Sequence, residues 1–348
     1  MERIIRYTAF FLTGLMLLCM LIMGSNSESA SLIIRKIDAL RMKNVVQTEF
    51  LPPESQAVPE EIPASPIIAE PADESPTPPP LETQLPILGR DEIKETTISG
   101  GLTIKNETNF VIDIPSVLSA GTDIVLSPGA PQVLIIHTHS SEAYTPAGLD
   151  RYEASDNHRT EDKEYNIIRV GDELAAIYQD AGLNVIHDRG IYDSPSYTGS
   201  YTRSGAAIAE YLSRYPEIAI VIDMHRDALG ANGIVYKTMA EEDGVCASQL
   251  MLLVGSDESG LEHPHWRSNL SLALYMQNAV NTTYPTLMRP VSLVPQRYNQ
   301  HLPRGSLILE VGSDGNTLQE ALAAIRLFGK ATAPALKELV VEAVEEAV

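Results

Sequence analysis

Short apolar segments that alternate with helical patterns constrain this chain more than any other feature. Four of them span Val133–Ile136, Ile218–Ile222, Gln249–Val254 and Leu307–Val311. Apolar runs of this length are typical of strands buried on both faces of a parallel sheet. Apolar residues with helical spacing lie between or after these segments, at 166–181, 204–215, 269–281 and 317–347. This alternation predicts an α/β domain with a mixed, mainly parallel sheet flanked by helices and joined by right-handed crossovers.

Shorter strands are expected at 103–114, 124–126 and 184–187. The folded domain is therefore predicted to start near Thr97 and to extend to residue 348.

The N-terminal 24 residues predict a membrane anchor. Arg3 and Arg6 precede the run Tyr7–Met23, which carries no charge and is almost long enough to cross a bilayer. Positive charge before the span places the N-terminus in the cytoplasm and the rest of the chain outside. A cleaved signal peptide is the alternative, because small polar residues follow the run. No small-x-small cleavage site adjoins the run, so we favour a single-pass protein of the cell membrane with an extracytoplasmic domain.

A spacer is predicted between the anchor and the domain, at residues 25–96. Its densest part, 51–86, is rich in Pro, Glu, Ser and Ala. Such a composition buries too little apolar surface to fold, so the segment should be extended.

Charge and cysteine content exclude several classes of function. The formal net charge is −21, which argues against non-specific nucleic-acid binding, because phosphate contacts require Lys and Arg. Cys19 and Cys246 are the only cysteines, which excludes a disulfide scaffold and a cysteine-based zinc site. Any metal would have to use His, Asp and Glu. Nucleotide-binding glycine motifs and the Gly-x-Ser-x-Gly elbow are absent from the sequence.

The first apolar strand is followed by His137, His139 and Glu142. Ligands of open α/β sheets gather at the carboxyl ends of strands. Residues two apart on an extended chain face the same side, so both imidazoles can point in one direction. His139 and Glu142 can supply a nitrogen and an oxygen to zinc if the chain turns after His139. The alternative is a pair of hydrogen-bonded histidines at a strand end.

His225 follows the second of these strands and could be a third zinc ligand. Three protein ligands leave one position for water, which is the arrangement of a catalytic zinc site. Asp223 or Asp227 could orient the imidazole. Arg226 could bind a substrate carboxylate or polarise a carbonyl, or it could form an ordinary salt bridge.

Glu310 lies in the last apolar strand, where an acid is costly unless it has a partner or a task. It suits a general base that takes a proton from water and passes it to a leaving amine. An ion pair with Arg304 or Lys330 is the alternative. Two histidines and two glutamates on separate strands together predict a zinc-dependent hydrolase.

Four segments, 137–144, 165–171, 197–204 and 223–228, resemble the stage II sporulation protein P family. The resemblance runs from about Leu102 to about Leu336 and includes the N-terminal anchor and spacer. It implies an N-acetylmuramoyl-L-alanine amidase related to the amidase type 3 fold. It also implies endopeptidase activity on stem peptides, a role at the septum during engulfment, and stage II sporulation proteins D and M as partners.

The resemblance further implies a His-Glu-His zinc site with a late-strand catalytic glutamate. His139 and His225 then hold zinc and Glu310 is catalytic. The middle ligand is Glu142 by its His-x-x-Glu spacing, as in zinc carboxypeptidases, or Glu164 by its place before the first helix. We favour Glu142, and His137 then either shapes the substrate site or competes with His139.

The predicted activity is cleavage of the amide between the muramic acid lactyl group and L-alanine in peptidoglycan. Two alternatives stay open at this point: a zinc peptidase acting on stem peptides, and a non-catalytic scaffold that binds the cell wall.

Overall fold

The computed structural model describes residues 97–99, 101–155, 158–231 and 234–341. The predicted anchor and spacer lie outside these residues. Within the described ranges, no helix is both long and apolar enough to cross a membrane.

An eight-stranded sheet forms the centre of the domain, in the order β1-β2-β11-β10-β12-β5-β3-β4. Its strands are β1 (Thr97–Ser99), β2 (Leu102–Asn106), β11 (Val291–Val294), β10 (Leu250–Gly255), β12 (Ser306–Ser313), β5 (Ile220–Asp227), β3 (Val133–Ile136) and β4 (Val185–His187).

Two blocks of parallel strands meet in this sheet. β12, β5, β3 and β4 run parallel to one another, and so do β2, β11 and β10. The blocks join where β10 pairs antiparallel with β12, and β1 pairs antiparallel with β2 at the edge. The mixed, mainly parallel sheet predicted from the sequence is confirmed.

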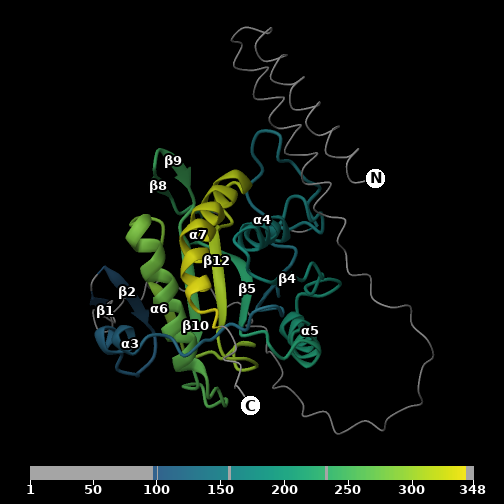
Figure 1. Ribbon diagram of the computed structural model, residues 1–348. Coiled ribbons are helices and arrows are strands. Elements are labelled where there is room, and N and C mark those ends of the chain that lie inside the picture. The colour runs from purple at the N-terminus through teal and green to yellow at the C-terminus, as the bar shows by residue number, and fades with distance from the viewer. Residues whose placement is uncertain (1–96, 100, 156–157, 232–233, 342–348) are drawn as a thin grey trace, which may run out of the picture. The chain divides into compact units, whose positions relative to one another are not determined.

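Helices α4 (Ile167–Asp180), α6 (Trp266–Thr283) and α7 (Leu318–Glu338) cover one face of the sheet. Figure 1 shows α6 and α7 in front of the strands, with α4 beside α7. The main core lies between these helices and the sheet and includes Tyr178, Trp266 and Phe328. Burial of this apolar surface is the main force that holds the layers together.

Helix α5 (Ser200–Arg214) packs on the opposite face. Ile208 of this helix joins a smaller apolar cluster with Leu134, Ile136, Ile218 and Val221. Even-numbered residues of β3 and odd-numbered residues of β5 therefore face α5, as the period of two in a strand requires. The second face of the sheet is the one on which the polar residues of β5 and β12 gather.

Several elements differ from the sequence-based expectation. The expected strand at 103–114 is shorter, and helix α3 (Ile114–Ala120) begins at its end, where Asp113 caps the helix. Residues 124–126 form only an isolated bridge, between Leu126 and Val340. Strand β11 was not predicted. Two hairpins, β6 (Gly230–Ala231) with β7 (Ile234–Val235) and β8 (Ala240–Glu242) with β9 (Val245–Ala247), were also missed.

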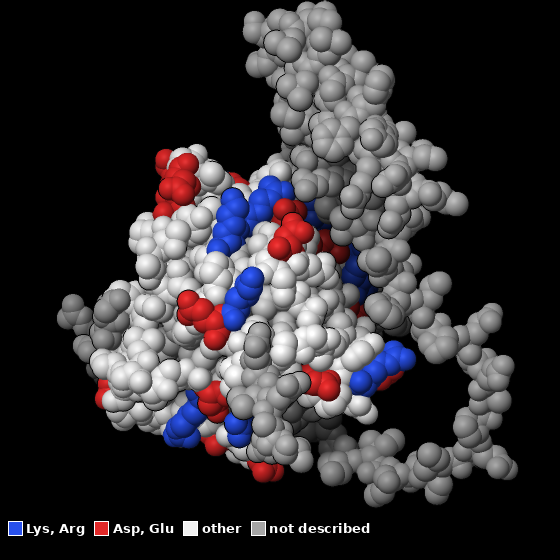
Figure 2. Space-filling model, in the orientation of Figure 1, with Lys and Arg blue, Asp and Glu red and all other residues white. Residues whose placement is uncertain are grey.

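The C-terminal helix α7 has a capping box formed by Thr317 and Glu320 and ends at Glu338, earlier than the predicted 347. On the face seen in Figure 2, Lys and Arg side chains are scattered between Asp and Glu side chains over the described part of the molecule.

Candidate active site

The three strands that carry the predicted site residues are neighbours in the sheet. β12 pairs with β5 and β5 pairs with β3, all in parallel, so His225, Glu310 and the chain after Ile136 approach one another. The strands β5 and β12 are longer than predicted, and both His225 and Glu310 lie inside them. The strand period directs Asp223, His225 and Glu310 to the face that α5 covers.

Glu310 and His225 are direct partners in the register between β12 and β5. The Oε2 atom of Glu310 is shielded from solvent and has no hydrogen-bond partner among the described residues. Burial raises the pKa of Glu310 to about 8. No salt bridge joins it to Arg304, which pairs with Asp123 at 3.3 Å instead. A shielded carboxylate oxygen without a hydrogen-bond partner is a typical feature of a functional site.

His225 lies between two carboxylates. Its Nδ1 atom is 3.4 Å from Oε2 of Glu142, and its Nε2 atom is 3.0 Å from Oδ1 of Asp223. Burial alone would lower the pKa of His225, but the charges of Asp223 and Glu142 outweigh it and raise the pKa well above its usual value. Asp223 is fixed in turn by the backbone N–H and the hydroxyl of Thr138, at 2.8 and 2.6 Å. Asp223, one of the two aspartates considered from the sequence, is therefore held in place beside the imidazole of His225.

His139 reaches this site because the chain leaves β3 after Ile136 and turns. The ring centroids of His139 and His225 are 5.2 Å apart. The Nε2 atom of His139 lies 2.9 Å from the hydroxyl of Tyr197, and its Nδ1 atom lies 3.3 Å from the hydroxyl of Ser200. Burial lowers the pKa of His139 to about 4, with the nearby His225 adding to the effect.

Glu142, and not Glu164, accompanies the two histidines. Burial would raise the pKa of Glu142, but the charge and hydrogen bond of His225 lower it to about 2. The backbone N–H of Arg226 donates to the same carboxylate at 3.1 Å. Glu164 is exposed and lies 3.9 Å from Arg189, away from this group. Of the two glutamates left open by the sequence, Glu142 is therefore the one placed at the site.

The expected contact of His137 with substrate needs correction. His137 is fully buried, and its Nε2 atom is 2.8 Å from Nε2 of His187 while its Nδ1 atom is 3.2 Å from the carbonyl oxygen of Met224. It faces the α4 side of the sheet, where Gly171 packs against it. The two histidines do not point the same way, because the turn after β3 carries His139 to the other face.

Arg226 also differs from its predicted role in substrate binding. Its side chain is buried and donates to the carbonyl oxygens of Ala143, His158 and Asp227, with the last at 3.4 Å. The guanidinium therefore holds the loop between Ala143 and His158 against the end of β5. Among the described residues, these carbonyl contacts take the place of the alternative considered from the sequence, a salt bridge with an acidic side chain.

Whether these residues suit a metal depends on their donors. Two imidazoles and a carboxylate from separate segments form a donor set that zinc uses in proteins. Among the described residues, however, no group of three His, Cys, Asp or Glu side chains is arranged as a ready metal site. The reason is visible at His139, whose ring nitrogens face the hydroxyls of Tyr197 and Ser200. The residue types and their proximity fit zinc, provided that His139 exchanges a hydroxyl partner for the ion.

A sequence model of the family described as Stage II sporulation protein P (SpoIIP) matches residues 44–333. The chain belongs to the stage II sporulation protein P family. The Stage II sporulation protein P of Bacillus subtilis (strain 168) is 25% identical over 199 residues, which are 54% of this chain and 47% of that protein. The aligned region thus spans about half the length of this curated relative.

Solved amidases show a weak structural likeness. N-acetylmuramoyl-L-alanine amidase AmiC2 of Nostoc punctiforme has 15% identity and a TM-score of 0.36, covering 61% of this chain and 98% of that chain. The N-acetylmuramoyl-L-alanine amidase of Clostridium difficile 630 has 12% identity and a TM-score of 0.37, covering 60% and 96%. At TM-scores this low, the likeness carries no argument about the reaction of this SpoIIP-family chain.

Tyrosine rings lie beside the two histidines. Residues 192–201 are rich in tyrosine, but the positions of these rings depend on how the chain folds. Tyr197 stacks on His139 with ring centroids 4.3 Å apart, and Tyr201 lies edge-on to His139 at 5.4 Å. Tyr298, which was not anticipated, contacts Tyr201 at 5.4 Å from a distant loop. These rings form an aromatic side of the site next to His139 and His225.

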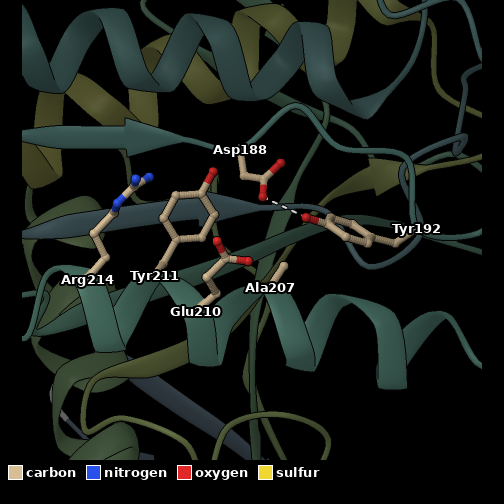
Figure 3. A pocket seen from close by; sticks show the side chains of 6 residues that line it. All are labelled: Asp188, Tyr192, Ala207, Glu210, Tyr211 and Arg214. Carbon is tan, nitrogen blue, oxygen red and sulfur yellow. Dashed lines mark hydrogen bonds between the residues drawn. The ribbon is translucent and has the colours of Figure 1, made fainter. Parts of the chain in front are cut away.

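A separate pocket of about 230 Å³ lies between α5 and the chain that follows β4. The residues that line it are Asp188, Tyr192, Ala207, Glu210, Tyr211 and Arg214. Figure 3 shows the hydroxyl of Tyr192 directed at Asp188, to which it donates at 2.6 Å. None of the predicted site residues lines this pocket. The candidate active site is therefore the group around His225 and Glu310, and this pocket is a distinct feature.

Proposed function

We propose that this chain is a peptidoglycan hydrolase: a zinc-dependent N-acetylmuramoyl-L-alanine amidase that acts during sporulation. The observation that carries the proposal is the pairing of Glu310 with His225, with Oε2 of Glu310 buried and unpartnered among the described residues. Membership of the stage II sporulation protein P family supports a role in sporulation. The bond proposed for cleavage joins the muramic acid lactyl group to L-alanine.

His139, Glu142 and His225 are the proposed zinc ligands. When bound, zinc supplies Lewis acidity, which polarises a substrate carbonyl and makes water more acidic. Support comes from the donor types and from the short separations of these side chains, 3.4 Å between Glu142 and His225 and 5.2 Å between the two imidazole centroids.

Proton transfer is assigned to Glu310. Its Oε2 atom is shielded from solvent and has no hydrogen-bond partner among the described residues, so the carboxyl group can take a proton from the attacking water and deliver it to the amine of L-alanine. Asp223 keeps the imidazole of His225 in a fixed orientation, because both oxygens of Asp223 are held by Thr138. Tyr197 and Tyr201 reduce the water around the reacting groups, which strengthens the electrostatic interactions there.

The proposed location rests on the N-terminal sequence, which lies outside the described residues. The proposed partners rest on the family. The apolar run 7–23 would anchor the chain in the cell membrane, and the domain would work outside it at the septum. Stage II sporulation proteins D and M are the proposed partners.

Digestion of purified peptidoglycan by the full-length chain tests the reaction. Mass spectrometry should detect free lactyl ends together with stem peptides that begin at L-alanine. Glu310→Gln should abolish the products while the zinc content stays near one per chain. Glu241→Gln, at an exposed position of β8, is the matched control and should remain active.

The same digestion separates the alternatives. New amino-acid ends within the stem, without free lactyl ends, would replace the amidase by a peptidase. A chain that cleaves neither bond and purifies without stoichiometric zinc would be a cell-wall-binding scaffold. Loss of zinc in Glu310→Gln would make Glu310 a ligand and would contradict its proposed role.

A further inference from the structure

Arg289 is a charged side chain at the active site that the reaction described above does not use. It precedes β11, and one of its terminal nitrogens, Nη1, donates to Oδ2 of Asp227 at 2.9 Å. Asp227 is the last residue of β5, two positions after His225. The ion pair therefore fixes the guanidinium of Arg289 over the end of the strand that carries His225.

The other two nitrogens of this guanidinium have no hydrogen-bond partner among the described residues. Nε and Nη2 of Arg289 are both shielded from solvent and make no hydrogen bond within the described residues. These two N–H groups lie on the same edge of the guanidinium and form a planar fork that matches the two oxygens of a carboxylate. Leaving buried donors unpaired costs free energy, so an unpaired fork at a site indicates that a ligand completes it.

The fork is close to the catalytic carboxyl group. Burial is the main cause that raises the pKa of Glu310, and among the smaller effects Asp227 raises it further while Arg289 lowers it. Met251 of β10 is the register partner of Glu310, and the adjacent Leu250 bridges to Met288, the residue before Arg289. Arg289 therefore continues the row of side chains that starts at His225 and Glu310.

We propose that Arg289 binds a free carboxylate of the substrate next to the scissile amide. The substrate class is an N-acyl-L-alanyl peptide whose second residue is linked through its side chain and so keeps its α-carboxylate. That group is about one residue, or roughly 3.5 Å, beyond the L-alanine whose amine receives the proton from Glu310. This inference rests on the proposed function and adds a preference for stems in which this carboxylate is not amidated.

A purely structural role for Arg289 makes a different prediction. An ion pair with Asp227 needs only one N–H donor and a positive charge, and the ammonium group of a lysine supplies both. Binding of a carboxylate by the fork needs two parallel N–H groups, which a lysine lacks. Arg289→Lys therefore separates the two roles, and Arg289→Met removes both.

The test uses the full-length chain with zinc and two synthetic muramyl tripeptides. They differ only in whether the second residue carries an α-carboxylate or an α-carboxamide. Wild-type kcat/KM should favour the carboxylate by roughly 10- to 100-fold, the range expected for hydrogen bonds to a charged group. Both Arg289 variants should reduce this ratio to about one, mainly through a higher KM for the carboxylate. Arg304→Met is the control, because Arg304 is exposed and pairs with Asp123, and it should keep the wild-type ratio.

Calorimetric binding of the same tripeptides to the Glu310→Gln chain provides a readout that does not need turnover. The Glu310→Gln chain should bind the carboxylate tripeptide more tightly than the carboxamide, and the double variant with Glu310→Gln and Arg289→Lys should lose this preference. That result supports the inference even if the bond cleaved is not the proposed one. Equal binding of the two tripeptides, or a preference that survives Arg289→Lys, overturns it. Absence of hydrolysis by wild type with intact selective binding contradicts the proposed function alone.

Discussion

Gly171 of α4 lies against His137 so closely that a Cβ atom at position 171 would be 2.6 Å from Nε2 of the imidazole. The same Cβ would be 2.6 Å from Nε2 of His187, which itself contacts Asp172 at 3.1 Å. The Nε2 atoms of His137 and His187 are 2.8 Å apart, and the pair forms a buried link between α4 and the end of β3. This contact sets how near the helix can approach the strand from which His139 departs.

Gly171→Ala should therefore destabilise the domain although alanine is the better helix former. Overpacking of a buried contact costs about 2 kcal/mol, which exceeds the roughly 1 kcal/mol gained in helix propensity. Urea denaturation followed by circular dichroism measures the change in the free energy of unfolding. Asp180→Ala, at an exposed position of the same helix, is the control and should change it by less than about 0.5 kcal/mol. A Gly171→Ala chain as stable as wild type would show that the histidines can move aside.

The ion pairs of Glu173, which join α4 to α7, should make the stability of the domain depend on pH. It accepts hydrogen bonds from Arg326 at 2.7 Å and from Arg169 at 3.2 Å. Burial raises the pKa of Glu173, but these two arginines outweigh it and hold the pKa below the usual 4.5. Because the folded pKa is depressed, the stabilisation is fully present above the unfolded value and is lost as pH falls through the folded value.

Glu173→Gln should accordingly lower the free energy of unfolding by about 1 kcal/mol at pH 7. The difference from wild type should shrink as the pH drops below 4.5. Denaturant titrations across this range measure it, with the exposed Glu161→Gln as a control that should show no such trend. A difference that stays constant with pH would mean that the charge of Glu173 does not stabilise the fold.

The sequence predicted the strongly apolar strands of the sheet better than the shorter strands and the pairing between strands. Val133–Ile136 has the bounds predicted, because four buried apolar residues in succession leave few alternatives. β11 was missed because its four residues, Val291–Val294, include a serine and follow a proline. Its place between β2 and β10 depends on long-range pairing, which no local pattern records.

Residue types at the candidate site were predictable, but their directions were not. Strand spacing suggested that His137 and His139 share a side, and this holds only while the chain stays extended. The turn after Ile136 separates them. The contacts of Arg226 with three carbonyl groups and the position of Arg289 depend on loops that meet only in the folded chain.

His225→Ala should abolish hydrolysis and lower the zinc content of the purified chain. It should also lower the free energy of unfolding by about 3 kcal/mol, because Asp223 and Glu142 lose the imidazole that lies between their carboxylates. Far-ultraviolet circular dichroism should stay native, since the main core lies on the opposite face of the sheet. Removing zinc from the wild type with a chelator should also stop hydrolysis, and added zinc should restore it. A His225→Ala chain that retains zinc and turnover would contradict the ligand assignment.

Thr138→Val removes the side-chain support given to Asp223, together with the contact of the same hydroxyl with Ser204 at 2.7 Å. Valine preserves the volume of this fully buried residue and keeps the backbone N–H that donates to Asp223 at 2.8 Å. It removes the hydroxyl that donates to the other carboxylate oxygen at 2.6 Å, at a cost of about 2 kcal/mol because the acceptor is charged. The looser carboxylate should orient His225 less well, so kcat should fall about tenfold while KM changes little.

Thr332→Val is the matched control for this change. Its hydroxyl is also buried but bonds to Tyr178 and to the carbonyl of Phe328 in α7, away from the site. Thr332→Val should lower the free energy of unfolding by about 1 kcal/mol, as expected for a neutral hydrogen bond, and should leave kcat unchanged. Steady-state kinetics and denaturation of both variants decide the matter. If Thr138→Val loses stability but keeps the wild-type kcat, Asp223 needs no hydroxyl to position His225, and the orienting role assigned to it is wrong.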